Sequence, residues 1–138
     1  MSTKTSLTPQ EQQAWAAALD DEYRSHETYQ RVIRDFGPVR PFINIVEAEA
    51  RHISALLALC ARYGVPPPPN RWRELAPRFG SVHDACVAGV QGEIENVALY
   101  DGLLLATPRP DVLEVFQALR SASQDRHLPA FRRCAQRG

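Results

Sequence analysis

The chain has 138 residues, a length that predicts one domain with its own hydrophobic core, residues 1–138. Its 44% hydrophobic and 23% charged residues are typical of a globular protein and exclude a disordered one. Sixteen basic and sixteen acidic residues cancel, so neither nucleic acid nor an anionic membrane is expected as a partner.

The N-terminal residues 1–8 are polar and are expected to be flexible, without a secretory signal. No apolar run approaches the ~20 residues that a membrane-spanning helix needs. The three cysteines are an odd number without paired spacing, which predicts a reduced, cytoplasmic protein. Cys60 and Cys134 occupy nearly corresponding places in the two halves of the chain, so a redox pair between them is an alternative.

A first long helix is predicted from Pro9 to the Gly37-Pro38 pair. Thr8 supplies an N-cap, Pro9 suits the first helical position, and Glu11 completes a capping box. A second helix is predicted from Pro41 to Gly64, with apolar residues at helical spacing.

Residues 65–80 contain four consecutive prolines and predict an extended crossover loop, held to the surface by Trp72, Leu75 and Phe79. Ser81 then predicts the start of a third helix, which ends before Pro108. A fourth helix begins at Pro110, and Pro129 is expected to kink it. The sequence therefore predicts an all-α fold of two helical hairpins joined by a long crossover.

The first and third helices share a spaced pair of residues. Glu22 and Tyr29 are seven residues apart in the first helix, and Glu93 and Tyr100 are seven apart in the third. Repeated helix pairs pack about a pseudo-two-fold axis. We therefore expect these residues to converge in the middle of the protein.

The second and fourth helices share a motif under the same alignment. Glu49 and His52 in the second helix correspond to Gln124 and His127 in the fourth. Residues at positions i and i+3 lie on one face of a helix, so both can reach one inward site. Carboxylates and imidazoles together suit iron or manganese, and buried carboxylates without a cation would be costly.

This pattern resembles the ferritin-like superfamily, in particular its short rubrerythrin-related members, over most of the chain. The resemblance implies a four-helix bundle with a di-iron or di-manganese centre for ferroxidase, peroxidase or oxygenase chemistry. It implies that Glu22 and Glu93 are terminal ligands, that Glu49 bridges, and that His52 and His127 are terminal imidazoles.

Two positions depart from the family pattern. Gln124 stands where the second bridging glutamate is expected, and Asn96 stands where rubrerythrins have a further carboxylate. An amide is a weaker, neutral ligand, so the centre is expected to hold one ion, two ions asymmetrically, or none. Tyr29 and Tyr100 are expected to hydrogen-bond the carboxylates, and His26 to lie beside the site or on the surface.

The first functional hypothesis is a metal-binding oxidase or peroxidase that uses iron or manganese with oxygen or peroxide. The alternative is a metal-free bundle that acts as an interaction or scaffold protein, for example as a homodimer through an exposed helix face. A third option is a small-ligand pocket lined by Tyr29, Tyr100 and the acids. Basic residues near the C-terminus are interpreted as solvated charges at a helix end: Arg126, Arg132, Arg133 and Arg137.

Overall fold

The computed structural model describes residues 6–137, and every regular element among them is a helix. The all-α fold class is therefore confirmed. The elements in chain order are α1 (Pro9–Phe36), α2 (Phe42–Tyr63), α3 (Val82–Leu103), α4 (Pro110–Ala122), the π-helical segment η2 (Ser123–His127) and α5 (Leu128–Arg137). The predicted flexible segment 1–8 lies largely outside the described residues.

The helix ends form where the sequence predicts them. At the start of α1 the Glu11 amide donates to Thr8 Oγ1 at 3.1 Å, and the Thr8 amide donates back to Glu11 Oε1 at 2.9 Å. Gly37 ends α1 with φ +91° and Gly64 ends α2 with φ +68°, a region that favours glycine. Ser81 caps α3 by accepting a hydrogen bond from the Asp84 amide at 3.0 Å.

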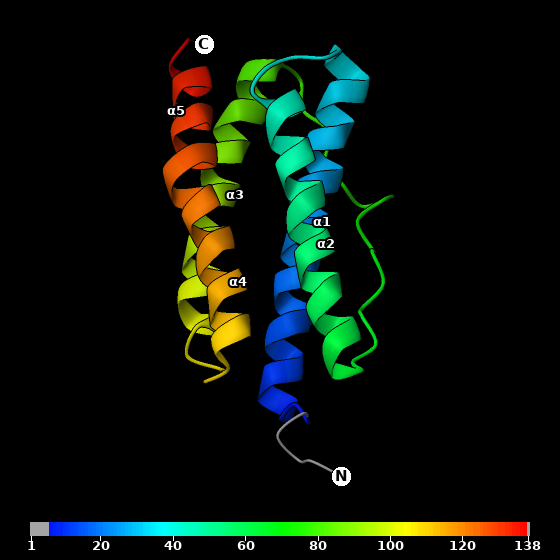
Figure 1. The fold of residues 1–138 in the computed structure, drawn as a ribbon. Coiled ribbons are helices and arrows are strands. Elements are labelled where there is room, and N and C mark those ends of the chain that lie inside the picture. Colours follow the sequence, from blue (N-terminus) through cyan, green and yellow to red (C-terminus); the bar gives the residue numbers. More distant parts are fainter. Residues whose placement is uncertain (1–5, 138) are drawn as a thin grey trace.

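The long helices lie side by side (Figure 1). Helix α2 packs mainly on α1, and α5 packs mainly on α3. The segments α4, η2 and α5 follow one another without a break, so they act as one long helix. Contacts between α2 and α4 are sparse, and this side of the protein is the more open one.

The crossover 65–80 runs along α1. Trp72 donates from Nε1 to Asp20 Oδ1 at 3.1 Å, which fixes the middle of the loop. Phe79 is half-buried, as expected, but the Leu75 side chain is 59% exposed. The expectation that Leu75 holds the loop is wrong, because the hydrogen bonds and ion pairs to α1 hold it instead.

Two apolar clusters fill the interior, one towards each end of the helices. In one cluster Trp15 meets Phe116 edge to face at 5.9 Å, and in the other Phe42 meets Phe131 at 5.2 Å. Apart from Glu11 at the start of α1, the buried polar residues of the helices lie between these clusters in sequence: Glu22, Ser25 and Thr28 in α1, Glu49 in α2, Glu93 and Asn96 in α3, and Ser123 and His127 in η2. The fold thus places a polar layer between two apolar ones.

The fourth helix is irregular where the sequence predicts a kink. The Leu128 amide donates to the Ser123 carbonyl, five residues back, which makes η2 a single wide turn. Pro129 follows directly and has no N–H to give to the carbonyl of Asp125. Ser123 and His127, at the two ends of this turn, are both buried.

Helices α3 and α5 are in close contact at Gly89. A Cβ atom built on Gly89 would lie 2.7 Å from the ring of Phe131, which is fully buried. We expect Gly89→Ala to lower the free energy of unfolding by about 1–3 kcal/mol, because the ring has no free space to move into. Urea denaturation of the variant measures this loss.

Gly102, also helical and in α3, is the matched control. A Cβ there would meet no atom within 4 Å. Gly102→Ala is expected to leave stability unchanged or to raise it by up to about 1 kcal/mol, since alanine has the higher helix propensity. Equal effects of the two substitutions would contradict the close approach of Gly89 to Phe131.

Among residues 6–137, no helix combines the length and apolar character needed to cross a membrane.

Candidate metal centre

Five side chains singled out from the sequence meet in the polar layer. Glu22, Glu49, Glu93 and His127 are almost fully buried, and the His52 side chain is 11% exposed. They come from four different segments, α1, α2, α3 and η2. The folded chain therefore encloses three carboxylates and two imidazoles at one place; their role as metal ligands stays a prediction.

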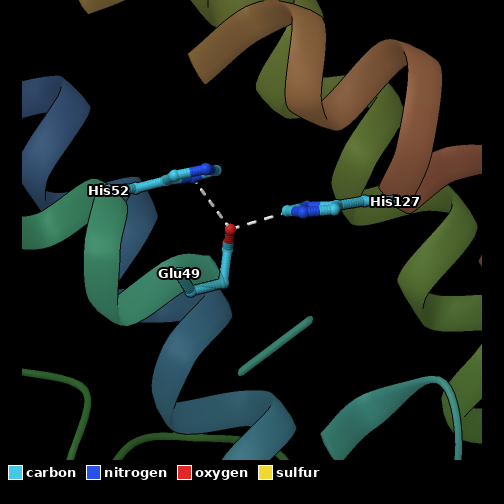
Figure 2. Close-up of side chains that lie close together, drawn as sticks. All are labelled: Glu49, His52 and His127. Carbon is cyan, nitrogen blue, oxygen red and sulfur yellow. Dashed lines mark ion pairs between the residues drawn. The ribbon is translucent and has the colours of Figure 1, made fainter. Parts of the chain in front are cut away.

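Glu49 occupies the middle of this cluster. Its Oε1 atom lies 3.1 Å from His52 Nδ1 and 3.5 Å from His127 Nδ1 (Figure 2). The two imidazole rings are nearly parallel, 5.6 Å apart with an interplanar angle of 16°. Ligand atoms of these three residues all lie within 4.8 Å of one another, which is compact enough to hold a metal ion.

Glu22 lies on the His52 side of the cluster. Its Oε1 atom is 3.1 Å from His52 Nδ1. Its Oε2 atom accepts a hydrogen bond from the Tyr100 hydroxyl at 2.7 Å and a second from Asn96 Nδ2 at 3.1 Å. One oxygen is thus anchored by the protein, and the other faces the centre.

Glu93 has a matching arrangement on the His127 side. Its Oε1 atom is 3.3 Å from His127 Nδ1, and its Oε2 atom accepts a hydrogen bond from the Tyr29 hydroxyl at 2.5 Å. Tyr29 in α1 therefore holds the glutamate of α3, while Tyr100 in α3 holds the glutamate of α1. The two Glu/Tyr pairs do converge, and each tyrosine contacts the glutamate of the other pair.

The protein groups around the cluster do not fully compensate the negative charge of its carboxylates. Glu49 Oε1 is buried and has no hydrogen-bond partner of suitable geometry among the described residues. Burial raises the pKa of Glu49 well above its usual 4.5, and the charge of Glu22 raises it further. A buried carboxylate without a full set of partners is unfavourable, and a divalent cation would supply what is missing. The donor set therefore fits iron or manganese.

His52 is strongly basic in this environment. Burial alone would lower the pKa of His52, but its interactions with the nearby carboxylates of Glu22 and Glu49 outweigh burial and raise the pKa from 6.5 to about 10. A metal ion would therefore have to displace a proton from the cluster, so uptake is expected to be more favourable at higher pH.

Gln124 lies on the exposed side of the helix, contrary to the expectation that it is a weak ligand or lies beside the ligands. Its side chain is exposed, and Ser123 is buried in its place. Positions three and four residues before a histidine can both share its helix face, and packing selects the position four before His127, whereas Glu49 lies three before His52. The true counterpart of Glu49 is therefore a serine.

Ser123 and Asn96 form a small neutral network beside the carboxylates. The Ser123 hydroxyl donates to Asn96 Oδ1 at 2.7 Å, and Asn96 Nδ2 donates to Asp21 Oδ2 at 2.6 Å. Sequence reasoning missed the role of Ser123; its spacing of four positions from both Leu119 and His127 is the signal that could have found it. Asn96 has a visible signal, because it follows Glu93 at the same i+3 spacing as His52 follows Glu49.

His26 lies outside the cluster and its Nδ1 atom is 3.1 Å from Glu27 Oε2, as expected for a residue near the surface. Tyr29 and Tyr100 are fully buried with their hydroxyl groups on Glu93 and Glu22. A cavity of about 890 Å³ does open onto the cluster, but it lies between α2 and the α4–η2–α5 helix, and neither tyrosine lines it.

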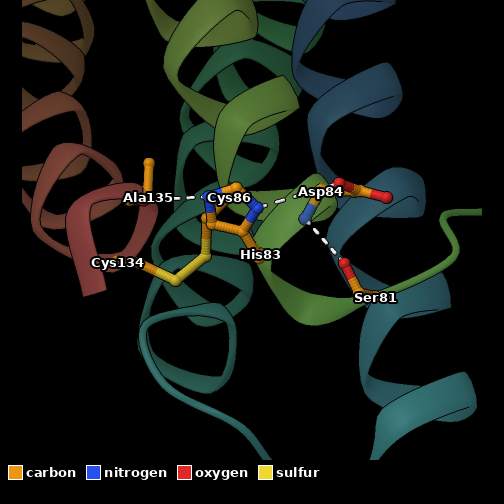
Figure 3. The surroundings of a disulfide bond; sticks show 6 residues. All are labelled: Ser81, His83, Asp84, Cys86, Cys134 and Ala135. Carbon is orange, nitrogen blue, oxygen red and sulfur yellow. Dashed lines mark hydrogen bonds and ion pairs between the residues drawn. A yellow bond between two sulfur atoms is a disulfide. The ribbon is translucent and has the colours of Figure 1, made fainter. Parts of the chain in front are cut away.

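The cysteines differ from the expectation of three free thiols. Cys86 at the start of α3 and Cys134 near the end of α5 form a disulfide (Figure 3), and Cys60 is free and buried. The suggested pair of Cys60 with Cys134 is therefore wrong, because Cys60 belongs to the other apolar cluster. Disulfides are rare in reducing compartments, and the cytoplasmic location stays a prediction.

No family model matches the chain, and no curated protein matches its sequence. Among solved structures, a hypothetical protein from Methanococcus jannaschii DSM 2661 has a similar fold, with a TM-score of 0.85 and 21% sequence identity. The alignment covers 95% of this chain and 82% of that one. At this identity the similarity supports the helical fold alone.

Proposed function

We propose that this protein is a ferritin-like four-helix bundle that binds iron or manganese at Glu22, Glu49, Glu93, His52 and His127. The observation that carries the proposal is the buried Oε1 atom of Glu49, which faces both imidazoles and has no hydrogen-bond partner of suitable geometry among residues 6–137. Three carboxylates at one buried place are difficult to explain without a cation.

The protein groups have distinct tasks in this proposal. Glu49 is placed to bridge, and Glu22 and Glu93 each offer one oxygen while a tyrosine holds the other. When bound, the metal would supply oxidase or peroxidase chemistry with oxygen or peroxide. The two apolar clusters limit the access of water to the centre from both ends of the helices.

Metal loading tests the proposal. Protein purified without chelator is loaded anaerobically with Fe²⁺ or Mn²⁺, desalted, and analysed for metal content. We expect between one and two ions per chain, followed by consumption of oxygen or peroxide by the iron-loaded protein. Absence of bound metal under both conditions would refute the assignment.

A metal-free interaction or scaffold protein is the second candidate. Ser123 and Asn96 favour it, because their hydrogen-bonded pair fills the place of a fourth carboxylate with neutral groups. Four carboxylates would balance two divalent ions, whereas three leave an excess of positive charge.

Substitution at Ser123 distinguishes these candidates. Ser123→Glu should add an inward carboxylate and tighten binding of Mn²⁺ at least about tenfold, since the number of charged ligands tunes affinity over orders of magnitude. Gln124→Glu is the matched control and is expected to change nothing, because that side chain is exposed. Titrations with Mn²⁺ measure the affinity of both variants, and circular dichroism checks that they are folded. Tighter binding in Gln124→Glu alone would contradict the inward position of Ser123.

A further inference from the structure

A groove on the open side of the protein leads to the candidate metal centre. It lies between α2 and the α4–η2–α5 helix, and its volume of about 890 Å³ is that of a pocket for a small organic molecule, typically about 300–1,000 Å³. His52 and His127 line it, so a molecule in the groove would contact the cluster. Small side chains along it leave the space open: Ala48, Ala118, Ala122 and Ala130.

The groove concentrates positive charge in a protein whose net charge is zero. Its lining includes one carboxylate, Asp125, and five exposed arginines: Arg40, Arg51, Arg126, Arg133 and Arg137. None of the five forms an ion pair with a described carboxylate. Elsewhere on the described chain six arginines do form such pairs. These five guanidinium groups are therefore available to a ligand.

Arginine at this density favours a particular kind of ligand. The guanidinium group binds carboxylate and phosphate oxygens through two parallel hydrogen bonds. A concave surface with one sign of charge also raises the local concentration of the opposite ion. The apolar part of the lining, which includes Ile45 and Leu119, suits a hydrocarbon body next to the anionic group.

We propose that this groove binds an amphipathic organic anion, a carboxylate or phosphate monoester with an alkyl or aryl body, as the substrate of the adjacent centre. Arg51 and Arg126 directly precede His52 and His127 in the chain, so they bring the anionic group near the cluster. The role of the anion as a substrate rests on the proposed metal function. The binding of the anion to the groove does not depend on that function.

Calorimetric titration of metal-free protein tests the binding. Octanoate and octyl phosphate are the probes; octylammonium tests the sign of the charge, and butanoate tests the contribution of the body. We expect both octyl anions to bind, butanoate to bind at least about tenfold more weakly, and octylammonium not to bind. Equal affinities for butanoate and octanoate would show that the hydrocarbon body does not contribute to binding. The groove would then be only a basic surface patch, and the proposal would be overturned.

Two kinds of variant locate the binding. Arg51→Gln/Arg126→Gln should weaken octanoate binding at least about tenfold. The control Arg34→Gln/Arg73→Gln removes two other exposed arginines that form no ion pair with a described carboxylate and do not line the groove, and it should leave the affinity unchanged. Ala122→Phe should abolish binding by filling the groove. Equal loss in the arginine control, or full binding in Ala122→Phe, would show that the anion binds elsewhere.

The two proposals can fail separately. Metal content without octanoate binding would retain the metal function and overturn the anion groove. Octanoate binding that depends on Arg51 and Arg126, without any metal uptake, would retain the groove and overturn the metal function. If both hold, metal loading is expected to change the affinity for octanoate, and octanoate to change the metal affinity by the same factor.

Discussion

Replacing Glu49 with glutamine is expected to abolish metal binding while the helices remain folded. Glu49 is the carboxylate that faces both His52 and His127, and glutamine keeps its size while removing the charge. Changes to groups that only support a ligand already cost about 10–100-fold in metal affinity. Loss of the central ligand should therefore exceed about 100-fold, measured by metal analysis after anaerobic loading.

The same variant should not lose stability in its metal-free form. In the metal-free protein, burial and the neighbouring Glu22 disfavour the charged form of Glu49 and raise its pKa. The folded protein therefore binds this proton more tightly than the unfolded chain does. Protonated Glu49 adds stability at low pH, and this contribution is lost as the pH rises above the usual pKa of 4.5. Metal-free Glu49→Gln is therefore expected to be at least as stable as the metal-free wild type at pH 8, in thermal unfolding followed by circular dichroism.

Glu47→Gln provides the control for this experiment. Glu47 lies on the same helix, two residues away, and its side chain is exposed. Metal content should remain at the wild-type value in this variant. Unchanged metal content in Glu49→Gln would instead show that any bound ion lies outside the Glu49 cluster.

Loss of the Cys86–Cys134 disulfide is expected to lower the free energy of unfolding by about 4 kcal/mol. The bond closes a loop with a sequence separation of 48 residues, and about this amount follows from the chain entropy that such a loop removes from the unfolded state. The loop contains Glu93 and His127, so reduction is also expected to loosen two residues of the cluster. Urea denaturation with and without a phosphine reductant measures the loss.

Thiol counting verifies the bond itself. Alkylation of the denatured, unreduced protein should modify Cys60 alone, and alkylation after reduction should modify all three cysteines. A Cys60→Ala variant should show the same dependence of stability on the reductant. Three modified cysteines before reduction would contradict the disulfide.

Local sequence signals determined the helices of this protein. Thr8, Glu11 and Ser81 act on backbone groups within one turn, and Gly37 and Gly64 act through their own backbone angles. Such short-range effects need no tertiary partner, so the helix ends agree with the prediction. The repeated Glu and His spacing also indicated which residues meet, because a helix period fixes the face on which a side chain lies.

Long-range packing decided what these local signals could not. Gln124 faces outward and Ser123 inward, although positions three and four residues before His127 can both share its face in a helix, so the helical period did not decide between them. The disulfide depends on how α5 packs on α3, and spacing in the sequence does not give that distance.

The arginine groove shows most clearly which properties follow from the sequence and which depend on the tertiary structure. The sequence determined a net charge of zero, and it indicated only a basic stretch near the C-terminus. Folding brings Arg126, Arg133 and Arg137 opposite Arg51 in α2 and Arg40 in the turn before it. Electrostatic potential depends on distances between charges in space, and only the tertiary structure sets those distances.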